Sequence, residues 1–126
     1  MLKIAGNQIT ITRGNSATIE ITPYIGSLET PVILSEDDKV LFTVKDSFKK
    51  IKFKKVLTKE NQDSSTGAVT LTLFPEDTIN FLEQNYSYDC VLIYTNGDAY
   101  TFIPSSLFIV STAIGTYADL DGDNNE

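Results

Sequence analysis

The sequence has no histidine and no tryptophan, and it has a single cysteine, Cys90. Without histidine the chain cannot build Ser-His-Asp or Cys-His nucleophiles, or any metal site that uses imidazole. Only oxygen ligands are then available for a metal ion, which restricts the choice to calcium or magnesium. Cys90 stands among apolar neighbours, where cysteine packs as a small hydrophobic side chain. We therefore predict a non-enzymatic protein with no catalytic residues, no cofactor and no metal site.

Long apolar runs and an excess of positive charge are also missing. No stretch approaches the roughly 20 residues of a membrane-spanning helix, and the N-terminus lacks the apolar segment of a signal peptide. Together with the lone cysteine, this favours folding in a reducing cytosol. The net charge is −7, from 10 basic and 17 acidic side chains. Nucleic-acid binding requires a surplus of positive charge, so we expect neither a nucleic acid nor a membrane as partner.

Much of the sequence consists of segments in which apolar and polar residues alternate strictly. The alternation predicts strands at residues 8–13, 16–22, 39–45, 49–55, 68–74, 86–95, 98–103 and 107–113, with a short strand also open at 32–34. Pro75 followed by two acidic residues predicts one or two helical turns within 75–83. A chain of 126 residues is most simply one domain. The prediction is an all-β antiparallel sandwich of immunoglobulin-like size over 1–114, with seven or eight strands, one short helix and a disordered acidic tail at 115–126.

Residues 86–103 form the most informative stretch. Asn96-Gly97 separates two runs rich in aromatic and branched residues, and this dipeptide predicts a two-residue type I′ hairpin turn. Tyr86, Tyr88 and Cys90 fall on one face of the first strand and are predicted to be core. The dipeptide Gly14-Asn15 predicts a second antiparallel hairpin, between residues 8–13 and 16–22. A kink is expected at 104–106.

Two charged segments are the candidate interaction sites. Residues 45–59 hold seven of the ten basic residues, and lysines at alternate positions give the predicted strand a basic face. We favour a solvated edge strand over an anionic-ligand surface, since lysines discourage edge-to-edge pairing. Residues 23–38 form a loop that ends in three acidic residues. The predicted interface consists of Lys49, Lys50, Lys52, Lys54 and Lys55 facing Glu36, Asp37 and Asp38 of another subunit.

Other acidic groups imitate catalytic or metal sites incompletely. Asp119, Asp121, Asp123 and Glu126 resemble the start of a calcium loop, but Asn124 occupies the position of the required glycine. Glu76 with Asp77, like the acidic trio at 36–38, suits a cap or a solvated surface better than a glycosidase pair. A solvated tail and structural carboxylates are the favoured interpretations.

Several segments together resemble a known group of domains. They are residues 9–14, 40–45, 73–78, 86–90, 97–104 and 108–110. In these segments the chain resembles the N-terminal β-sandwich domain of baseplate upper proteins and related tail modules from phages and prophages of Gram-positive bacteria. The resemblance covers about residues 8–110 and rests on strand and turn residues rather than on a catalytic motif. Unlike those proteins, this chain has Cys90 where an aliphatic residue is common, and it stops where they continue, which favours a stand-alone accessory protein.

The resemblance implies a structural protein of a phage or prophage tail, in the baseplate or tail-tip region, made in the bacterial host cytoplasm and carried in the virion. Its partners would be other tail or baseplate proteins, and it would form a homo-oligomer or part of a symmetric assembly. The alternative is a carbohydrate-binding module for a host-surface glycan. That alternative needs exposed aromatic side chains in a row, with Tyr24, Tyr94 and Tyr100 as candidates.

Overall fold

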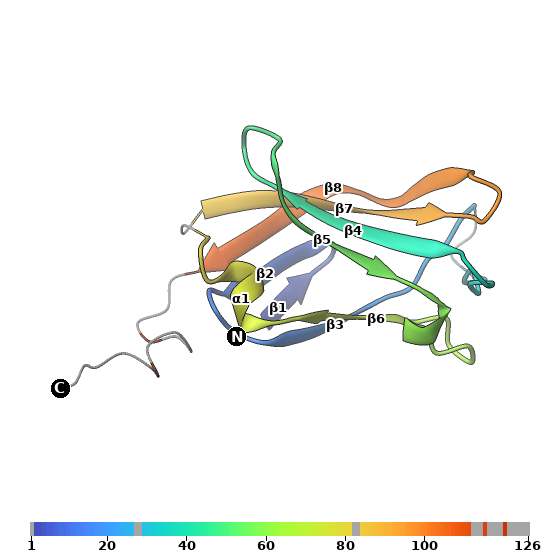
Figure 1. The fold of residues 1–126 in the computed structure, drawn as a ribbon, viewed down its shortest axis with the longest axis horizontal. Helices are drawn as coiled ribbons and strands as arrows, with labels where there is room; N and C mark the ends of the chain where they lie inside the picture. The colour runs from blue at the N-terminus through green and yellow to red at the C-terminus, as the bar shows by residue number, and fades with distance from the viewer. Residues whose placement is uncertain (1, 27–28, 82–83, 112–114, 116–119, 121–126) are drawn as a thin grey trace.

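A computed structural model describes residues 2–26, 29–81, 84–111, 115 and 120. The chain forms two packed β-sheets, which confirms the predicted all-β sandwich (Figure 1). The larger sheet has six strands in the order β1-β2-β8-β7-β4-β5 and the smaller has two, β3 and β6. The acidic tail with its calcium-loop residues lies outside the described residues, apart from Gly115 and Leu120.

The strands of the larger sheet are β1 (Leu2–Ala5), β2 (Gln8–Thr12), β4 (Lys39–Lys45), β5 (Ile51–Leu57), β7 (Gln84–Ile93) and β8 (Ala99–Ser111). The smaller sheet consists of β3 (Ala17–Ile21) and β6 (Val69–Leu73). A 3-10 turn, η1 (Lys59–Asn61), and one short helix, α1 (Pro75–Thr78), connect strands. Neighbouring strands are antiparallel except β2 and β8, which run parallel. The larger sheet is therefore mixed rather than purely antiparallel.

Alternation along the strands places one apolar row of each sheet in the shared core. On β4 the side chains of Val40, Phe42 and Val44 are fully buried, while Lys39 and Lys45 are exposed. The inner row of β7, with Tyr86, Tyr88, Cys90 and Leu92, is buried as predicted, and so is the inner row of β6, with Val69, Leu71 and Leu73. Every second residue of these strands is apolar and points inward, so the inner faces of the two sheets pack against each other and form the core.

Aromatic rings fill the centre of the sandwich. The ring of Phe42 stacks on Tyr88 with a centroid distance of 5.1 Å, and its edge-to-face contact with Phe108 is at 6.3 Å. Phe81, which follows α1, contacts Tyr86 at 4.6 Å. Offset and edge-to-face pairs of this kind add to the stabilisation from buried area. The tyrosines of β7 are thus core residues.

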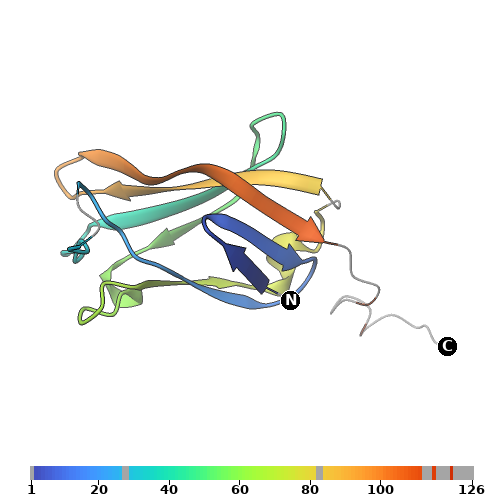
Figure 2. The ribbon, with the colours of Figure 1, turned by 180° about the vertical axis from the view of Figure 1, so that it is seen from behind.

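The predicted hairpin between residues 8–13 and 16–22 is wrong. Both segments are strands, but β2 pairs with β1 and β8, whereas β3 pairs with β6 in the other sheet. The connection is held at α1: the amide of Gly14 (φ 77°) donates to Oγ1 of the buried Thr78 at 2.8 Å, and Arg13 donates to the carbonyl of Ile79 at 2.8 Å. These bonds carry the chain from one sheet to the other. In Figure 2, seen from behind, this segment lies beside the β1–β2 hairpin.

Other local expectations also need correction. No strand forms at residues 32–34. The predicted short helix is confirmed, as the single turn α1. The strand β1 was not predicted. The kink at Pro104 is a bulge within the continuous strand β8, where the register with β7 shifts between Tyr88 and Val91. Proline is tolerated there because a bulge needs no ladder bond from its missing N–H.

The turn between β7 and β8 is a three-residue turn rather than type I′. The amide of Gly97 donates to the carbonyl of Tyr94 at 2.9 Å, and the amide of Tyr94 donates to the carbonyl of Asp98 at 2.8 Å. Gly97 has a φ of 98°, whereas Asn96 is not in the left-handed region. This is the pattern of a type I turn followed by a left-handed residue.

Candidate functional site

The turn between β4 and β5 lies within the predicted basic segment and carries a highly exposed aromatic side chain. We call residues 46–50 the Phe48 turn, and it projects beyond the sheet in Figure 1. The side chain of Phe48 is 83% exposed, although a large aromatic side chain normally gains by burial. Lys49 and Lys50 follow it directly, so the turn presents one aromatic ring beside two positive charges.

Asp46 fixes the conformation of the Phe48 turn. Its carboxylate oxygen Oδ1 accepts hydrogen bonds from the amides of Phe48 at 2.8 Å and Lys50 at 2.9 Å. The backbone adds bonds from the Asp46 amide to the Lys50 carbonyl and from the Lys49 amide to the Asp46 carbonyl. Lys49 has a φ of 65°, in the left-handed region that a lysine rarely occupies. The turn is therefore rigid, and a rigid aromatic group loses little conformational entropy when it binds.

The sequence analysis did not identify Phe48, because the alternating lysines are the dominant pattern in this segment. The signal was present: an Asp two residues before an aromatic residue favours an Asx turn, since the Asp side chain accepts the amide two residues on. In a turn the aromatic side chain has no opposite sheet to cover it. The feature could thus have been found as an apolar residue inside a polar turn.

The lysines of the predicted basic strand divide into two groups. Lys55 points to the same side as Phe53 and forms an ion pair with Asp77, Nζ to Oδ2 at 2.8 Å. The ammonium group of Lys52 lies 5.3 Å from the ring centre of Phe81. These two lysines contact the body of the protein, and Asp77 acts as a structural carboxylate that also accepts the amide of Phe74 at 2.7 Å.

Lys49, Lys50 and Lys54 form the outward-facing group. All three are exposed, and within the described part of the chain none forms an ion pair. The strand β5 is an edge of the larger sheet, as expected for a lysine-rich strand. The basic surface available to a partner is therefore the Phe48 turn with Lys54, rather than the whole strand.

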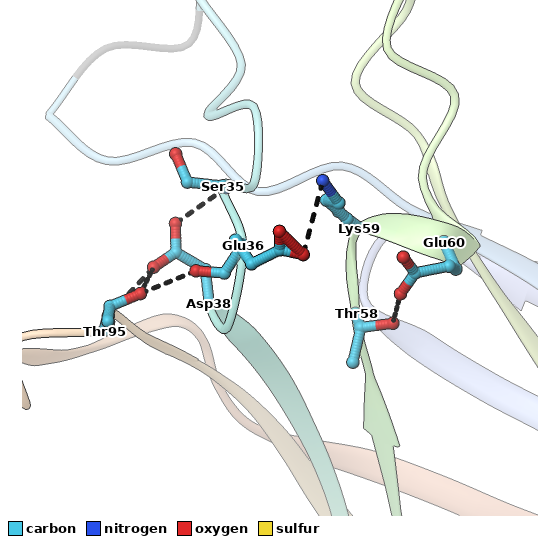
Figure 3. A network of polar contacts seen from close by, with 7 residues as sticks. All are labelled: Ser35, Glu36, Asp38, Thr58, Lys59, Glu60 and Thr95. Atoms are coloured by element: carbon cyan, nitrogen blue, oxygen red, sulfur yellow. Dashed lines mark hydrogen bonds and ion pairs between the residues drawn. The ribbon is translucent and has the colours of Figure 1, made fainter.

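The acidic loop is mostly an internal brace (Figure 3). Asp38 is only 4% exposed, which removes it from the predicted interface. Its Oδ1 accepts from the amide and the hydroxyl of Thr95 at 2.8 and 2.9 Å, and its Oδ2 accepts from the amide of Ser35 at 2.8 Å. Thr95 also donates to the carbonyl of Glu36. The loop thereby anchors the β7–β8 turn to the start of β4.

The ionisation of Asp38 follows from these contacts. Burial disfavours the charged carboxylate, but the hydrogen bonds from Ser35 and Thr95 and the nearby charge of Lys39 outweigh it and hold the pKa of Asp38 below its usual value. Glu36 and Asp37 are exposed, and Glu36 lies 3.7 Å from the ammonium group of Lys59. Within one chain, the acidic residues precede the start of β4, whereas Lys49 and Lys50 follow its end and Lys54 and Lys55 pair with its middle.

Cys90 is a core residue, as predicted. Its side chain is fully buried, and burial raises the pKa of the thiol to about 12, with a smaller contribution from the nearby Asp89 carboxylate. A thiol of this kind is protonated at neutral pH and is a poor nucleophile. Among the residues that the structure describes, no three acidic or cysteine side chains gather closely enough to hold a metal ion.

The three candidate tyrosines do not form one row. Tyr94 and Tyr100 contact each other edge to face at a centroid distance of 5.9 Å, and Tyr100 is 44% exposed. Tyr24 lies elsewhere, on the wall of a separate pocket. A shallow hollow of about 340 Å³ lies beside Tyr94, and Asp38 and Asn96 also line it. The pair could stack against a sugar, but its tilted rings do not make a flat platform.

A slot of about 420 Å³ lies between the two sheets, under the turn that joins β1 and β2. Its wall combines polar residues, which include Asn7, Glu20 and Thr22, with apolar ones, which include Ile4, Ile19, Ile21, Tyr24, Phe102 and Ile103. It lies beside β3, along whose other edge no described strand pairs, so the two-stranded sheet leaves the interior partly uncovered there. Sequence alternation gave no indication of this slot, because it depends on how the sheets overlap.

None of the helices in the described residues is long and apolar enough to cross a membrane. No protein-family model matches the chain, and the curated proteins contain no match to it.

Proposed function

We propose that this chain is a non-enzymatic structural module of a phage or prophage tail, and that it acts by protein–protein association. The resemblance of about residues 8–110 to baseplate modules supports the tail assignment. The observation that carries the association is the Phe48 turn, a rigid exposed aromatic residue flanked by lysines. Buried aromatic anchors beside charged groups carry most of the affinity at many protein interfaces.

The chemistry of the remaining groups fits this proposal better than an enzyme. The thiol of Cys90 is buried and protonated, while the carboxylates of Asp38 and Asp77 accept hydrogen bonds that hold the fold. A binding module requires a rigid framework and a prepared contact surface, and it requires no reactive side chain.

The test uses intact particles from the native host. Tails purified after induction should contain this chain as a stoichiometric component, and genes for a tape measure, tail fibres or a lysin should neighbour its own. The variant Phe48→Ser should be lost from the particles, because its aromatic anchor is missing. The control is Ile33→Ser, which removes another exposed apolar side chain, 47% exposed against 83% for Phe48, from a different surface. Absence of the chain from purified tails, or normal incorporation of Phe48→Ser, would contradict the proposal.

Carbohydrate binding is a second candidate, supported by the exposed Tyr100 beside Tyr94 and the adjoining hollow. A glycan array followed by calorimetric titration of the best sugar tests it. Binding should require Tyr100, so that Tyr100→Ala abolishes the heat of binding and Phe48→Ser leaves it unchanged. An array without signal would remove this candidate.

A further inference from the structure

One side of the molecule carries an exposed aromatic ring, and the other carries a hollow that fits one. The Phe48 turn joins β4 and β5, at one edge of the six-stranded sheet. The slot lies under the β1–β2 turn, at the opposite edge of the same sheet. The ring cannot enter the slot of its own chain, because four strands of the sheet separate β1 from β5.

The slot has room for an aromatic side chain, and its wall offers apolar side chains beside polar ones. Its volume of about 420 Å³ exceeds that of a phenylalanine ring and falls within the range of specific ligand sites. Ile4 is 48% exposed at its mouth, so water now contacts an apolar surface that an inserted ring would cover. Burial of both surfaces favours association, since each removes apolar area from water.

Charge at the mouth of the slot is complementary to the Phe48 turn. Glu20 lines the slot and is exposed, and none of the described residues forms an ion pair with it. Lys49 and Lys50 follow Phe48 directly and are equally unpaired. A ring that enters the slot therefore brings two ammonium groups toward an unpaired carboxylate, and complementary charges of this kind orient the two surfaces.

We propose that Phe48 of one copy inserts into the slot of a second copy, with Lys49 and Lys50 beside the Glu20 carboxylate of that copy. This inference rests on the proposed function and names the partner of the Phe48 turn. The two contact surfaces are different, so the contact is heterologous: the first copy keeps its slot free, and the second copy keeps its ring free. Contacts of this kind build rings when the rotation between copies closes, and filaments when it does not.

The first test measures the oligomeric state of the purified full chain by sedimentation velocity between about 1 μM and 1 mM, around the weak affinities of small interfaces. The wild-type protein should form species larger than a dimer as concentration rises. Phe48→Ser and Ile4→Lys should each weaken association by about tenfold or more, which is the loss typical of an interface anchor. Ile33→Ser is the control and should associate like the wild type. Raising the salt concentration should weaken association, because the charges at the mouth are screened.

A mixing experiment separates this contact from any symmetric one. Phe48→Ser retains an intact slot, and Ile4→Lys retains an intact ring. At a concentration where the wild type associates and each variant alone stays monomeric, their mixture should give a one-to-one dimer and nothing larger. A photoreactive phenylalanine analogue at position 48 should cross-link to peptides that contain Glu20 or Tyr24 of the other copy.

Three results would overturn the inference: a wild-type monomer at the highest concentration, a mixture without dimer, or cross-links to peptides that do not line the slot. A failure here is distinguishable from a failure of the proposed function. If the wild type stays monomeric but Phe48→Ser is still lost from tails, then Phe48 binds a different protein. In that case the proposed self-association is wrong and the proposed function stands.

Discussion

The two long hairpins of the larger sheet end in turns of the same architecture but of different use. In the Phe48 turn the amide of Lys49 bonds the carbonyl of Asp46, and in the β7–β8 turn the amide of Gly97 bonds the carbonyl of Tyr94. The left-handed position holds lysine in the first turn and glycine in the second. The same backbone conformation thus occurs in the proposed contact surface and in a structural corner.

The difference lies in what holds each turn. Asp46 belongs to its own turn and bonds two of its amides, so the Phe48 turn is self-contained. The β7–β8 turn depends on Asp38, which comes from a loop 57 residues away in sequence. A turn that is braced from within can project and present a side chain, whereas a turn braced by the tertiary structure becomes part of the fold. Four predictions test this contrast.

The largest effect is expected from removal of the tertiary brace. Asp38→Ala removes the acceptor of the partly buried hydrogen bonds from Ser35 and Thr95, so it should lower the free energy of unfolding by about 2–3 kcal/mol. Urea denaturation measures this. Glu36→Ala is the control, because the Glu36 side chain is exposed and forms only a surface ion pair, and it should change stability by less than about 0.5 kcal/mol. Equal losses in the two variants would mean that the carboxylate of Asp38 is not the brace.

The same carboxylate makes the stability of the β7–β8 corner depend on pH. The pKa of Asp38 is lower in the folded state than its usual value, so the folded state is favoured whenever the carboxylate is charged. This contribution should be complete at neutral pH and should be lost as the pH falls below about 4, the ordinary range of an aspartate. Asp38→Asn should flatten this part of the stability profile measured between pH 2 and 6. An unchanged acid profile would contradict the assignment.

The left-handed position of the β7–β8 turn should require glycine. A Cβ at Gly97 meets no atom within 4 Å, so Gly97→Ala adds no steric clash and only forces alanine into a left-handed conformation. We expect a loss of about 1–2 kcal/mol in the free energy of unfolding. Thermal and urea unfolding measure this, and a variant as stable as the wild type would show that the turn adopts another conformation.

The reverse substitution in the Phe48 turn should have the opposite effect on the free energy of unfolding. Lys49→Gly relieves a left-handed lysine, and it should raise the free energy of unfolding by up to about 1 kcal/mol, less the extra entropy that glycine has in the unfolded chain. Phe48→Ser should have the smallest effect, within about 0.5 kcal/mol, since the ring is exposed. A large loss of stability in Phe48→Ser would show that the ring packs on its own chain, which would contradict its role as a contact.

Strand positions were predictable because the sequence carries their periodicity directly. The inward residues Val40, Phe42 and Val44 alternate with outward ones. This alternation is the same whether the strand pairs with a parallel or an antiparallel neighbour. For that reason the alternation could not predict which strands pair. The placement of β2 and β3 in different sheets depends on Thr78 and Ile79, more than 60 residues away, which bond the connecting residues Gly14 and Arg13.

The candidate site was predictable only in part. The sequence identified the lysines near β5 but not which of them have partners. Lys55 forms an ion pair with Asp77, whereas Lys49 and Lys50 form none with the described residues. Asp38 was predicted as an exposed interface residue and is a buried brace instead. A carboxylate has the same sequence signature in both roles, and only the position of Thr95 decides between them.

By itself, the sequence determined an all-β chain without histidine chemistry, a core of alternating apolar residues, and two glycine- or aspartate-containing turns. These follow from residue type and spacing, which act over a few positions. The tertiary structure alone decided which strands share a sheet, where the two-stranded sheet leaves a slot open, and which charged side chains remain free for a partner. Those properties depend on contacts between residues distant in sequence, and local periodicity does not encode them.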